Sequence, residues 1–207
     1  MAAGIAKAGR LLAKKYTLQI TNVPYLSRGK QDKVMSDHID KHYKEAKGDL
    51  ATVFLEKMLK SNTLGGISCS VIPQNWLFLT SYKNYREKLL KNETWSIVTR
   101  LGTKSFQTPM YDFNVMLISI QHKKPTILIE FSGIDVSKYS DVYGKDIALK
   151  NVEHRLVNQL GQLKNPDSRI VIDDVEEHQL LNEFCSSTKG ISTSDDSVFV
   201  RFFWERK

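Results

Sequence analysis

The stretch Tyr16-Thr17-Leu18-Gln19-Ile20-Thr21-Asn22-Val23-Pro24-Tyr25 decides how the rest of this chain is interpreted. Residues 16–21 alternate between polar and apolar side chains and are rich in β-prone types, a pattern that predicts a strand. Pro24 cannot donate a backbone hydrogen bond to a sheet, so the strand should end just before it. Residues 22–25 therefore stand at the carboxyl end of a predicted parallel strand, the edge where open α/β sheets place their ligands.

Helices and strands alternate on both sides of this strand. Before it, apolar residues at helical spacing predict an amphipathic helix that runs to about residue 15. After it, the pattern predicts helices at residues 49–59 and 82–91 and strands at residues 67–72, 95–99, 113–120 and 126–131. The last two strands are joined by a short polar link, which indicates a hairpin. The order predicts an α/β fold with an antiparallel hairpin ending.

The character of the chain changes after about residue 131. A helix is predicted at residues 145–163, where Asn165-Pro166 stops it, followed by a short strand at 169–172 and a short helix at 176–184. Residues 186–197 are rich in Ser, Thr, Gly and Asp and predict a loop, and residues 198–204 predict an apolar strand. We therefore expect one part at residues 1–131 and a second, mostly helical part at residues 132–207.

The composition is that of an ordinary globular protein. The chain has 207 residues, of which 41% are hydrophobic and 26% charged, which argues against collagen, a coiled coil or a wholly disordered chain. No apolar run approaches the roughly 18 residues that a membrane-spanning helix needs, so no membrane partner is expected. The two cysteines, Cys69 and Cys185, stand far apart without a CxxC spacing, which argues against a zinc ribbon or a disulfide scaffold and fits the cytoplasm.

The net charge of +7 is compatible with a polyanionic partner such as nucleic acid. Most of the excess lies in the first quarter of the chain, because ten Lys or Arg but only four acidic residues stand between Lys7 and Lys47. The positive charge therefore clusters around residues 16–25.

Residues 22–25 suit the activation of an aromatic amine. Such an amine is a poor nucleophile because its lone pair is delocalised into the ring. The side-chain carbonyl of Asn22 and the backbone carbonyl of Val23 can both accept hydrogen bonds from such an amine. Tyr25 offers a flat face for an extruded base, and Pro24 restricts the backbone so that the carbonyl points inward. The alternative is an ordinary Asn-led turn at the end of a strand.

Three segments resemble one family. Thr21-Asn22-Val23-Pro24-Tyr25-Leu26 resembles motif IV, Asn-Pro-Pro-Tyr, of the amino-methylating DNA methyltransferases. The start of the helix that follows motif IV in these enzymes resembles Lys47-Gly48-Asp49-Leu50-Ala51. A later turn of the family resembles Pro73-Gln74-Asn75-Trp76-Leu77-Phe78-Leu79. Together they are similar to the adenine-specific enzymes of restriction-modification and phage-defence systems, in particular the BREX-type (PglX-like) branch. The resemblance covers most of residues 5–131. A second segment, residues 190–205, resembles the start of the family's DNA target-recognition region.

The resemblance implies a fold, a reaction and partners. The fold would be the C-terminal half of a Rossmann-like class I methyltransferase sheet. The reaction would transfer a methyl group from S-adenosyl-L-methionine to the exocyclic amine of a flipped adenine in double-stranded DNA. Asn22, Val23, Pro24 and Tyr25 would be the catalytic residues, with Val23 in place of the first proline of the motif; the backbone carbonyl survives that change.

The resemblance also suggests residues around the motif. Phe106 follows the Leu101-Gly102 turn and would stack on the flipped adenine together with Tyr25; the alternative is a core phenylalanine. Arg28 and Lys30 would contact DNA phosphates beside the active site; the alternative is a solvated basic loop. His38 and His42 have helical metal-ligand spacing without the Glu of HExxH, so no metal site is expected.

The cofactor half of such an enzyme is not visible in the sequence. The family holds S-adenosyl-L-methionine with a Gly-rich turn and an acidic residue upstream of motif IV, whereas only 21 residues precede Asn22 here, and Gly4 and Gly9 lie in the predicted helix. Residues 1–131 are therefore interpreted as a partial catalytic domain from motif IV onward, and 132–207 as a linker and the beginning of the recognition region. We expect an incomplete fragment, inactive alone, that a chain carrying the cofactor-binding half would complete.

Two alternatives remain open from the sequence. One is a non-catalytic DNA-binding or interaction module derived from such an enzyme. The other is methylation of RNA or of a protein amide, which similar motifs also serve.

Overall fold

The computed structural model describes residues 2–107, 113–173 and 184–185. The chain divides into two compact units, Met1–Asp173 and Asp174–Lys207. Every element below belongs to the first unit. The loop predicted at residues 186–197 and the strand predicted at 198–204 lie outside the described residues, as does all but the last residue of the helix predicted at 176–184.

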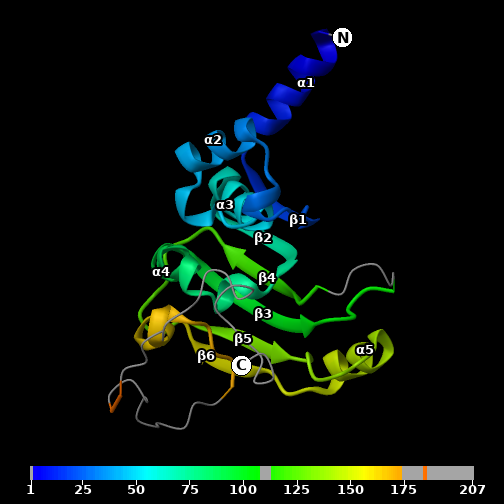
Figure 1. The fold of residues 1–207 in the computed structure, drawn as a ribbon, viewed down its shortest axis with the longest axis vertical. Coiled ribbons are helices and arrows are strands. Elements are labelled where there is room, and N and C mark those ends of the chain that lie inside the picture. The colour runs from blue at the N-terminus through cyan, green and yellow to red at the C-terminus, as the bar shows by residue number, and fades with distance from the viewer. Residues whose placement is uncertain (1, 108–112, 174–183, 186–207) are drawn as a thin grey trace, which may run out of the picture. The chain divides into compact units, whose positions relative to one another are not determined.

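Six strands form one mixed sheet in the order β1-β2-β4-β3-β5-β6 (Figure 1). They are β1 Tyr16–Asn22, β2 Asn62–Pro73, β3 Thr94–Gly102, β4 Val115–Gln121, β5 Glu130–Asp135 and β6 Arg155–Asn158. β1 is parallel to β2 and β3 to β5, whereas β4 lies between β2 and β3 and is antiparallel to both. The predicted α/β class is confirmed.

Five α-helices accompany the sheet: α1 Ala2–Ala13, α2 Lys33–His42, α3 Leu50–Ser61, α4 Lys83–Asn92 and α5 Val142–Asn151. The predicted helices at residues 49–59 and 82–91 are confirmed as α3 and α4. Asp49 caps α3, because its Oδ1 accepts a hydrogen bond of 2.8 Å from the backbone N–H of Ala51. Helix α2 is not predicted by the sequence pattern.

Two details of the predicted topology are wrong. Residues 113–120 were expected to form a hairpin with residues 126–131, but β4 pairs with β3 on one side and β2 on the other, while β5 lies on the far side of β3. The antiparallel hairpin is therefore β3–β4. The single helix expected at 145–163 is also wrong, because α5 ends at Asn151 and β6 follows it.

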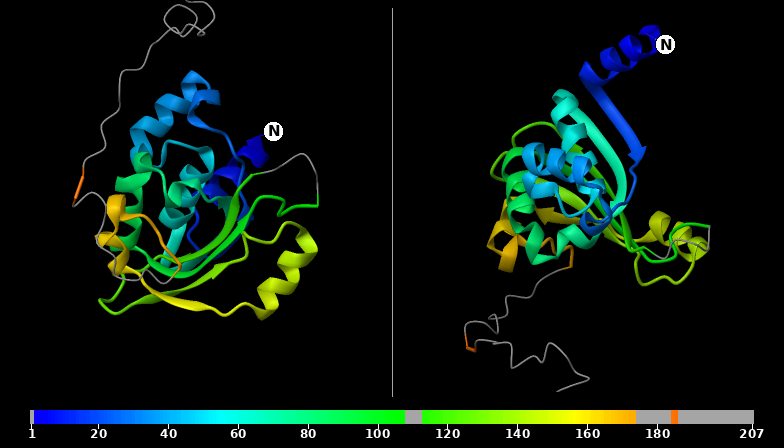
Figure 2. Two further views of the ribbon diagram at one scale, coloured as in Figure 1. Left: turned by 60° about the horizontal axis from the view of Figure 1, so that its bottom comes forward. Right: turned by 45° about the horizontal axis from the view of Figure 1, so that its top comes forward.

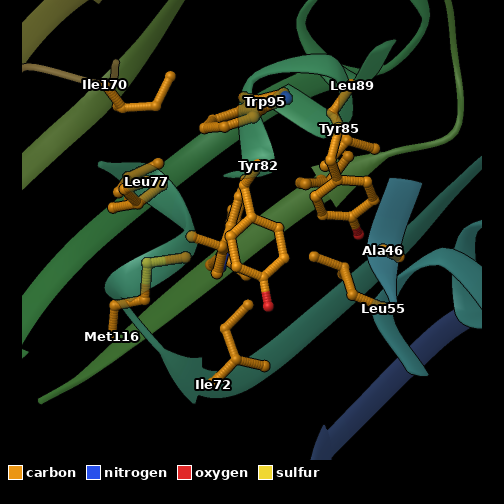
Figure 3. Close-up of a cluster of buried hydrophobic side chains, with 14 of the residues drawn as sticks. Ala46, Leu55, Ile72, Leu77, Tyr82, Tyr85, Leu89, Trp95, Met116 and Ile170 are labelled. Atoms are coloured by element: carbon orange, nitrogen blue, oxygen red, sulfur yellow. The ribbon is translucent and has the colours of Figure 1, made fainter. Parts of the chain in front are cut away.

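The main core lies between one face of the sheet and helices α3 and α4 (Figure 3). Leu55, Ile72, Tyr85 and Met116 are completely buried, and Trp95 is 1% exposed. The ring of Trp76 contacts two other aromatic rings: its centroid lies 5.5 Å from that of Tyr85 and 5.7 Å from that of Trp95. These large apolar side chains fix α3 and α4 on this face, as burial of their surface drives packing.

The core continues past residue 131, where the sequence predicts the end of the first part. Gln159 is completely buried, donates hydrogen bonds of 2.8 Å to the carbonyls of Leu90 and Glu93, and accepts one of 2.9 Å from the N–H of Trp95. Ile170 and Ile172 belong to the main core. After β6, residues 159–172 thus return to the helix α4 side of the sheet, and the first compact unit ends at Asp173.

The opposite face of the sheet is open between β1 and β3. Strand register places Ile20, Cys69, Ser119 and Ile97 in one row across this face. Ile20 is 73% exposed and Ile97 42% exposed. Figure 2 shows α2, α3 and α4 on the same side of the sheet. The free edge of β1 faces no other strand among the described residues.

Substituting Gly48 with alanine is expected to destabilise the fold by about 1–3 kcal/mol, the usual cost of overpacking. A Cβ at this position would lie 2.4 Å from the Tyr82 hydroxyl oxygen and 2.6 Å from its Cζ. Tyr82 is 7% exposed and packed in the core, so its ring cannot swing away. Urea unfolding followed by tryptophan fluorescence measures the change.

The matched control is Gly29→Ala, because a Cβ at Gly29 would meet no atom within 4 Å. That variant should stay within about 0.5 kcal/mol of the unchanged protein. Equal stabilities of the two variants would contradict the steric role of Gly48.

Candidate active site

Asn22 is the last residue of β1, beside Val71 of β2, and its side chain is exposed. Its Oδ1 lies 3.2 Å from the Tyr25 hydroxyl, which donates a hydrogen bond to it. The carbonyl of Val71 lies 3.4 Å from the same hydroxyl and competes for its single hydrogen. An amide oxygen has two lone pairs, so Asn22 keeps acceptor capacity for an incoming amine while Tyr25 is bound.

Val23 and Pro24 differ in their surroundings. Val23 is 4% exposed and its side chain belongs to the main core, whereas Pro24 is exposed. A buried valine side chain thus stands where the motif has its first proline. Packing of this side chain in the core, rather than a proline ring, restrains the backbone immediately after Asn22.

The loop that leaves the motif is attached to the start of α3. The N–H of Leu50 donates to the Leu26 carbonyl at 2.9 Å, and the N–H of Arg28 donates to the Gly48 carbonyl at 3.0 Å. The Asp49 side chain, which caps α3, also accepts from the N–H of Leu26 at 3.3 Å. Asp49 therefore connects the cap of a packed helix to the loop that carries Tyr25.

Tyr25 has an environment that keeps its hydroxyl protonated. Burial raises the pKa of Tyr25 to about 12, and the Asp49 carboxylate adds to the rise. The neutral phenol is therefore present at all pH values up to about 10, and Tyr25 stays a hydrogen-bond donor to Asn22 over that range. The Tyr25 ring meets the edge of Phe113, with centroids 5.8 Å apart and an interplanar angle of 85°.

Phe106 lies in the turn after β3. This turn begins with Gly102 at φ +73°, and the Ser105 hydroxyl donates to the Gly102 carbonyl at 2.9 Å. Phe106 is half-buried, and its stacking role stays a prediction. The aromatic ring that contacts Tyr25 is Phe113, which the sequence pattern assigns only to a strand. No spacing rule in the sequence connects these two rings, because their contact joins the ends of β1 and β4.

The two basic residues of the loop have different surroundings. Arg28 forms an ion pair of 2.5 Å with Asp40 of α2 and donates at 3.2 Å to the Ser36 carbonyl. It therefore links the loop to α2. Lys30 is exposed. The DNA-contacting role of both residues stays a prediction.

An apolar trough of about 480 Å³ lies on the open face of the sheet. Asn22 lines it, together with residues of five strands that include Ile20, Val71, Ile97, Leu117 and Ile134. The candidate catalytic amide is thus at the margin of an apolar surface rather than in an isolated turn.

Neither a metal centre nor a membrane span is found among the described residues. Within residues 2–107, 113–173 and 184–185, no group of three or more His, Cys, Asp or Glu is close enough to hold a metal ion. The rings of His38 and His42 are tilted by 40° to one another, with centroids 4.7 Å apart. None of the helices in this part of the chain is long and apolar enough to span a membrane.

Comparison with known proteins shows which family the first half of the chain is similar to. Residues 6–106 match the family described as Eco57I restriction-modification methylase. These residues are therefore similar to members of that family. The matched residues, which we call the methylase segment, include the motif at residues 22–25 and run from α1 to the turn after β3.

Two curated relatives are each similar to about half of this chain. The chain is 32% identical over 105 residues to "Adenine-specific methyltransferase PglX" of Lacticaseibacillus casei, which covers 50% of this chain and 8% of the relative. It is 30% identical over 99 residues to "Adenine-specific methyltransferase BrxX" of Escherichia coli. This alignment covers 46% of this chain and 8% of the relative. The chain thus spans less than a tenth of either relative.

Solved structures share the fold of the unit. The type I restriction-modification methyltransferase subunit from Streptococcus thermophilus superposes with a TM-score of 0.55 at 19% identity, over 77% of this chain and 38% of that chain. The Type ISP restriction-modification enzyme LlaGI, in complex with a DNA substrate mimic, superposes with a TM-score of 0.56 at 15% identity, over 79% and 19% of the two chains. The predicted methyltransferase type of α/β fold is confirmed.

Proposed function

We propose that this chain supplies the base-methylating part of an adenine-specific DNA methyltransferase of the restriction-modification or phage-defence type. The observation that carries the proposal is the pairing of Asn22 with Tyr25 at the carboxyl end of β1. The named relatives, both called adenine-specific methyltransferases, support the same reaction.

The chemistry of this chain's own residues is the activation of an amine. The Oδ1 of Asn22 and the backbone carbonyl of Val23 accept the two hydrogens of the exocyclic amine of adenine. These hydrogen bonds favour a more tetrahedral nitrogen, whose lone pair is then available for attack. The ring of Tyr25 supports the extruded base, and its hydroxyl donates to Asn22 and holds the amide in place.

The described residues do not fit the methyl donor, S-adenosyl-L-methionine, which supplies the activated methyl group when it is bound. Adenosine cofactors are held on sheets of this kind by a Gly-rich turn between a strand and a helix. Gly4 and Gly9 instead lie within α1, and a Cβ at either would meet nothing within 4 Å. Neither glycine serves a close backbone approach.

The cofactor is therefore proposed to come with a further α/β segment, carried by a partner chain, that joins at β1. Three features support this position. The outer edge of β1 has no strand beside it among the described residues, and Leu18 and Ile20 on this strand are 54% and 73% exposed. An apolar trough lies on each side of β1, one of about 480 Å³ on the open face and one of about 510 Å³ between α1, β1 and α3.

Isothermal titration of the 207-residue chain with S-adenosyl-L-methionine is expected to detect no micromolar binding. The reason is the lack of a cofactor cradle in the described residues. A cofactor-binding methyltransferase assayed in the same buffer serves as the positive control. A dissociation constant in the micromolar range for the chain alone would overturn the proposal that a partner supplies this half.

The reaction itself is tested in a chimera of the Lacticaseibacillus casei relative, in which its matching 105 residues are replaced by those of this chain. After incubation with labelled S-adenosyl-L-methionine and double-stranded DNA, the digested nucleosides are analysed by mass spectrometry. N6-methyladenine is the expected product. Methylcytosine, methylated RNA or methylated protein would contradict the adenine assignment.

The alternative of a non-catalytic DNA-binding module predicts a different outcome. A chimera that folds, as thermal unfolding shows, and binds DNA but yields no methylated base would favour that alternative over catalysis.

A further inference from the structure

A further concave surface lies beside the loop that follows the motif. We call it the basic pocket; its volume is about 380 Å³, and it is lined by Arg28, Lys44, Glu45, Lys47, Gly48, Ser81, Tyr82 and Asn84. These residues come from three parts of the chain: the loop after β1, the segment between α2 and α3, and the start of α4. The sequence gives no sign that they meet.

The charge of the basic pocket is positive. Three cations line it against one carboxylate, that of Glu45. Lys88 lies 3.5 Å from this carboxylate and 2.8 Å from that of Glu56, so its charge is shared between the two and offsets part of the Glu45 charge. A backbone hydrogen bond lowers the pKa of Glu45, and Lys88 adds to the decrease, so the pair stays ionic at neutral pH.

Asp40, outside the lining, limits the charge of the pocket. Its carboxylate lies 2.5 Å from Arg28 and 3.3 Å from Lys47, so one anion is shared by two cations. Desolvation raises the pKa of Asp40, but the hydrogen bonds and charges of Lys47 and Arg28 outweigh it and lower the pKa. Lys44 is exposed and makes no ion pair with another described residue.

Neutral donors complete the wall of the pocket. Ser81 and Asn84 are exposed, and their side chains make no hydrogen bond to another described residue. A hydroxyl and an amide beside lysine ammonium groups are the donor set that binds phosphate oxygens in nucleic-acid interfaces. Free lysines on a convex surface would lack these neutral donors.

The basic pocket adjoins the candidate active site through covalent and hydrogen-bonded connections. Arg28 is six residues after Asn22, and its N–H donates to the carbonyl of Gly48 at 3.0 Å. Gly48, Ser81 and Tyr82 also line a neighbouring cavity of about 270 Å³ beneath the cap of α3. The pocket therefore lies along the loop that carries Tyr25.

We propose that the basic pocket binds a phosphodiester of the DNA strand that carries the target adenine, with Lys44 and Lys47 as the charged contacts and Ser81 and Asn84 as the neutral donors. The inference rests on the proposed function, because it assigns the strand that this site methylates. Phosphate contacts fix the position of the duplex on the protein, and a contact beside the motif would hold the backbone of an extruded nucleotide.

The test is fluorescence anisotropy of a labelled 20-base-pair duplex of mixed sequence, titrated with the complete 207-residue chain. The variant Lys44→Ala/Lys47→Ala is expected to raise the dissociation constant about tenfold. It should also flatten the dependence of log K on log salt by about two, since each of the two lysines neutralises one phosphate. The weakening should be similar for duplexes of different sequence.

The matched control is Lys123→Ala/Lys124→Ala, which removes the same charge. These lysines follow Gln121, which strand register places in the row of Leu18, towards the other end of β1 from Asn22. The control should change the dissociation constant by less than threefold. An equal weakening in both variants would mean that only net charge matters, and it would overturn the inference.

A third variant is expected to strengthen DNA binding, whereas the lysine variants weaken it. Asp40→Asn removes the carboxylate shared by Arg28 and Lys47 and is expected to tighten DNA binding severalfold. Unchanged or weaker binding by this variant would contradict the phosphate site. The inference fails if the unchanged chain binds no DNA, or if it binds but both lysine variants behave alike. The proposed function is decided separately, by whether the chimera forms N6-methyladenine.

Discussion

The Asn22→Ala variant is expected to methylate DNA about 100-fold more slowly than the unchanged sequence, or slower still. Asn22 contributes an acceptor aimed at the amine, and loss of one preorganised hydrogen-bonding group at the reacting atom typically costs a factor of roughly 100–1,000 in rate. The side chain is exposed and its hydrogen-bond partner is Tyr25, so the fold should be unaffected. The rate is measured in the chimera as labelled methyl groups transferred per minute.

Two further variants separate catalysis from general damage. Tyr25→Phe keeps the ring but removes the hydroxyl that donates to Asn22, so its rate should fall by less than tenfold. Asn92→Ala makes the same substitution at the exposed last residue of α4 and should leave the rate unchanged. DNA binding should be equal in all three variants. An unchanged rate in Asn22→Ala would refute the role given to the amide.

The candidate site could be found in the sequence because its signal is local. A strand that alternates up to Thr21 and ends before Pro24 places Asn22 at the carboxyl edge of a sheet, and the structure has β1 end at Asn22. The partners of the motif are not local. Phe113 reaches Tyr25 only because β4 inserts beside β2, and Asp49 reaches Leu26 only because α3 begins next to the loop.

The order of the strands in the sheet was harder to predict, because it too depends on contacts between residues far apart in the sequence. The row Cys69, Ser119 and Ile97 joins residues from β2, β4 and β3, whose order in the sheet differs from their order in the sequence. Alternation predicts that each strand exists but not its neighbour, since adjacent strands are found by packing in three dimensions. Helix α2 was missed because its sequence is mostly polar and Ile39 is its one buried residue in the structure.

The buried arginine of α4 is a second example of a nonlocal feature. Arg86 is completely buried, and its guanidinium donates to the backbone carbonyls of Trp76 at 2.5 Å, Leu79 at 2.8 Å, Asp167 at 2.7 Å and Ser168 at 3.1 Å. Burial lowers the pKa of Arg86, while the charge of Asp167 opposes the decrease. One side chain thus joins the turn after β2 to a turn more than eighty residues later in the chain.

Arg86→Ala is expected to lower the free energy of unfolding by about 4 kcal/mol. The substitution removes four charge-assisted hydrogen bonds and leaves their acceptors, of which those of Trp76 and Ser168 belong to buried residues, without this donor. It also opens a cavity the size of the missing side chain. For a unit of this length the midpoint of thermal unfolding should fall by roughly 8–16 °C. Urea unfolding followed by the fluorescence of the buried Trp76 and Trp95 measures the effect.

Arg86→Lys distinguishes geometry from charge in this prediction. A lysine keeps the positive charge, but its three hydrogens cannot match the planar fork that serves four carbonyls, so most of the destabilisation should persist. Arg10→Ala is the control, because Arg10 is exposed on α1 and should contribute less than about 0.5 kcal/mol. Full stability of Arg86→Ala would mean that residues 166–168 are held by their apolar neighbours Ile170 and Ile172 rather than by the guanidinium.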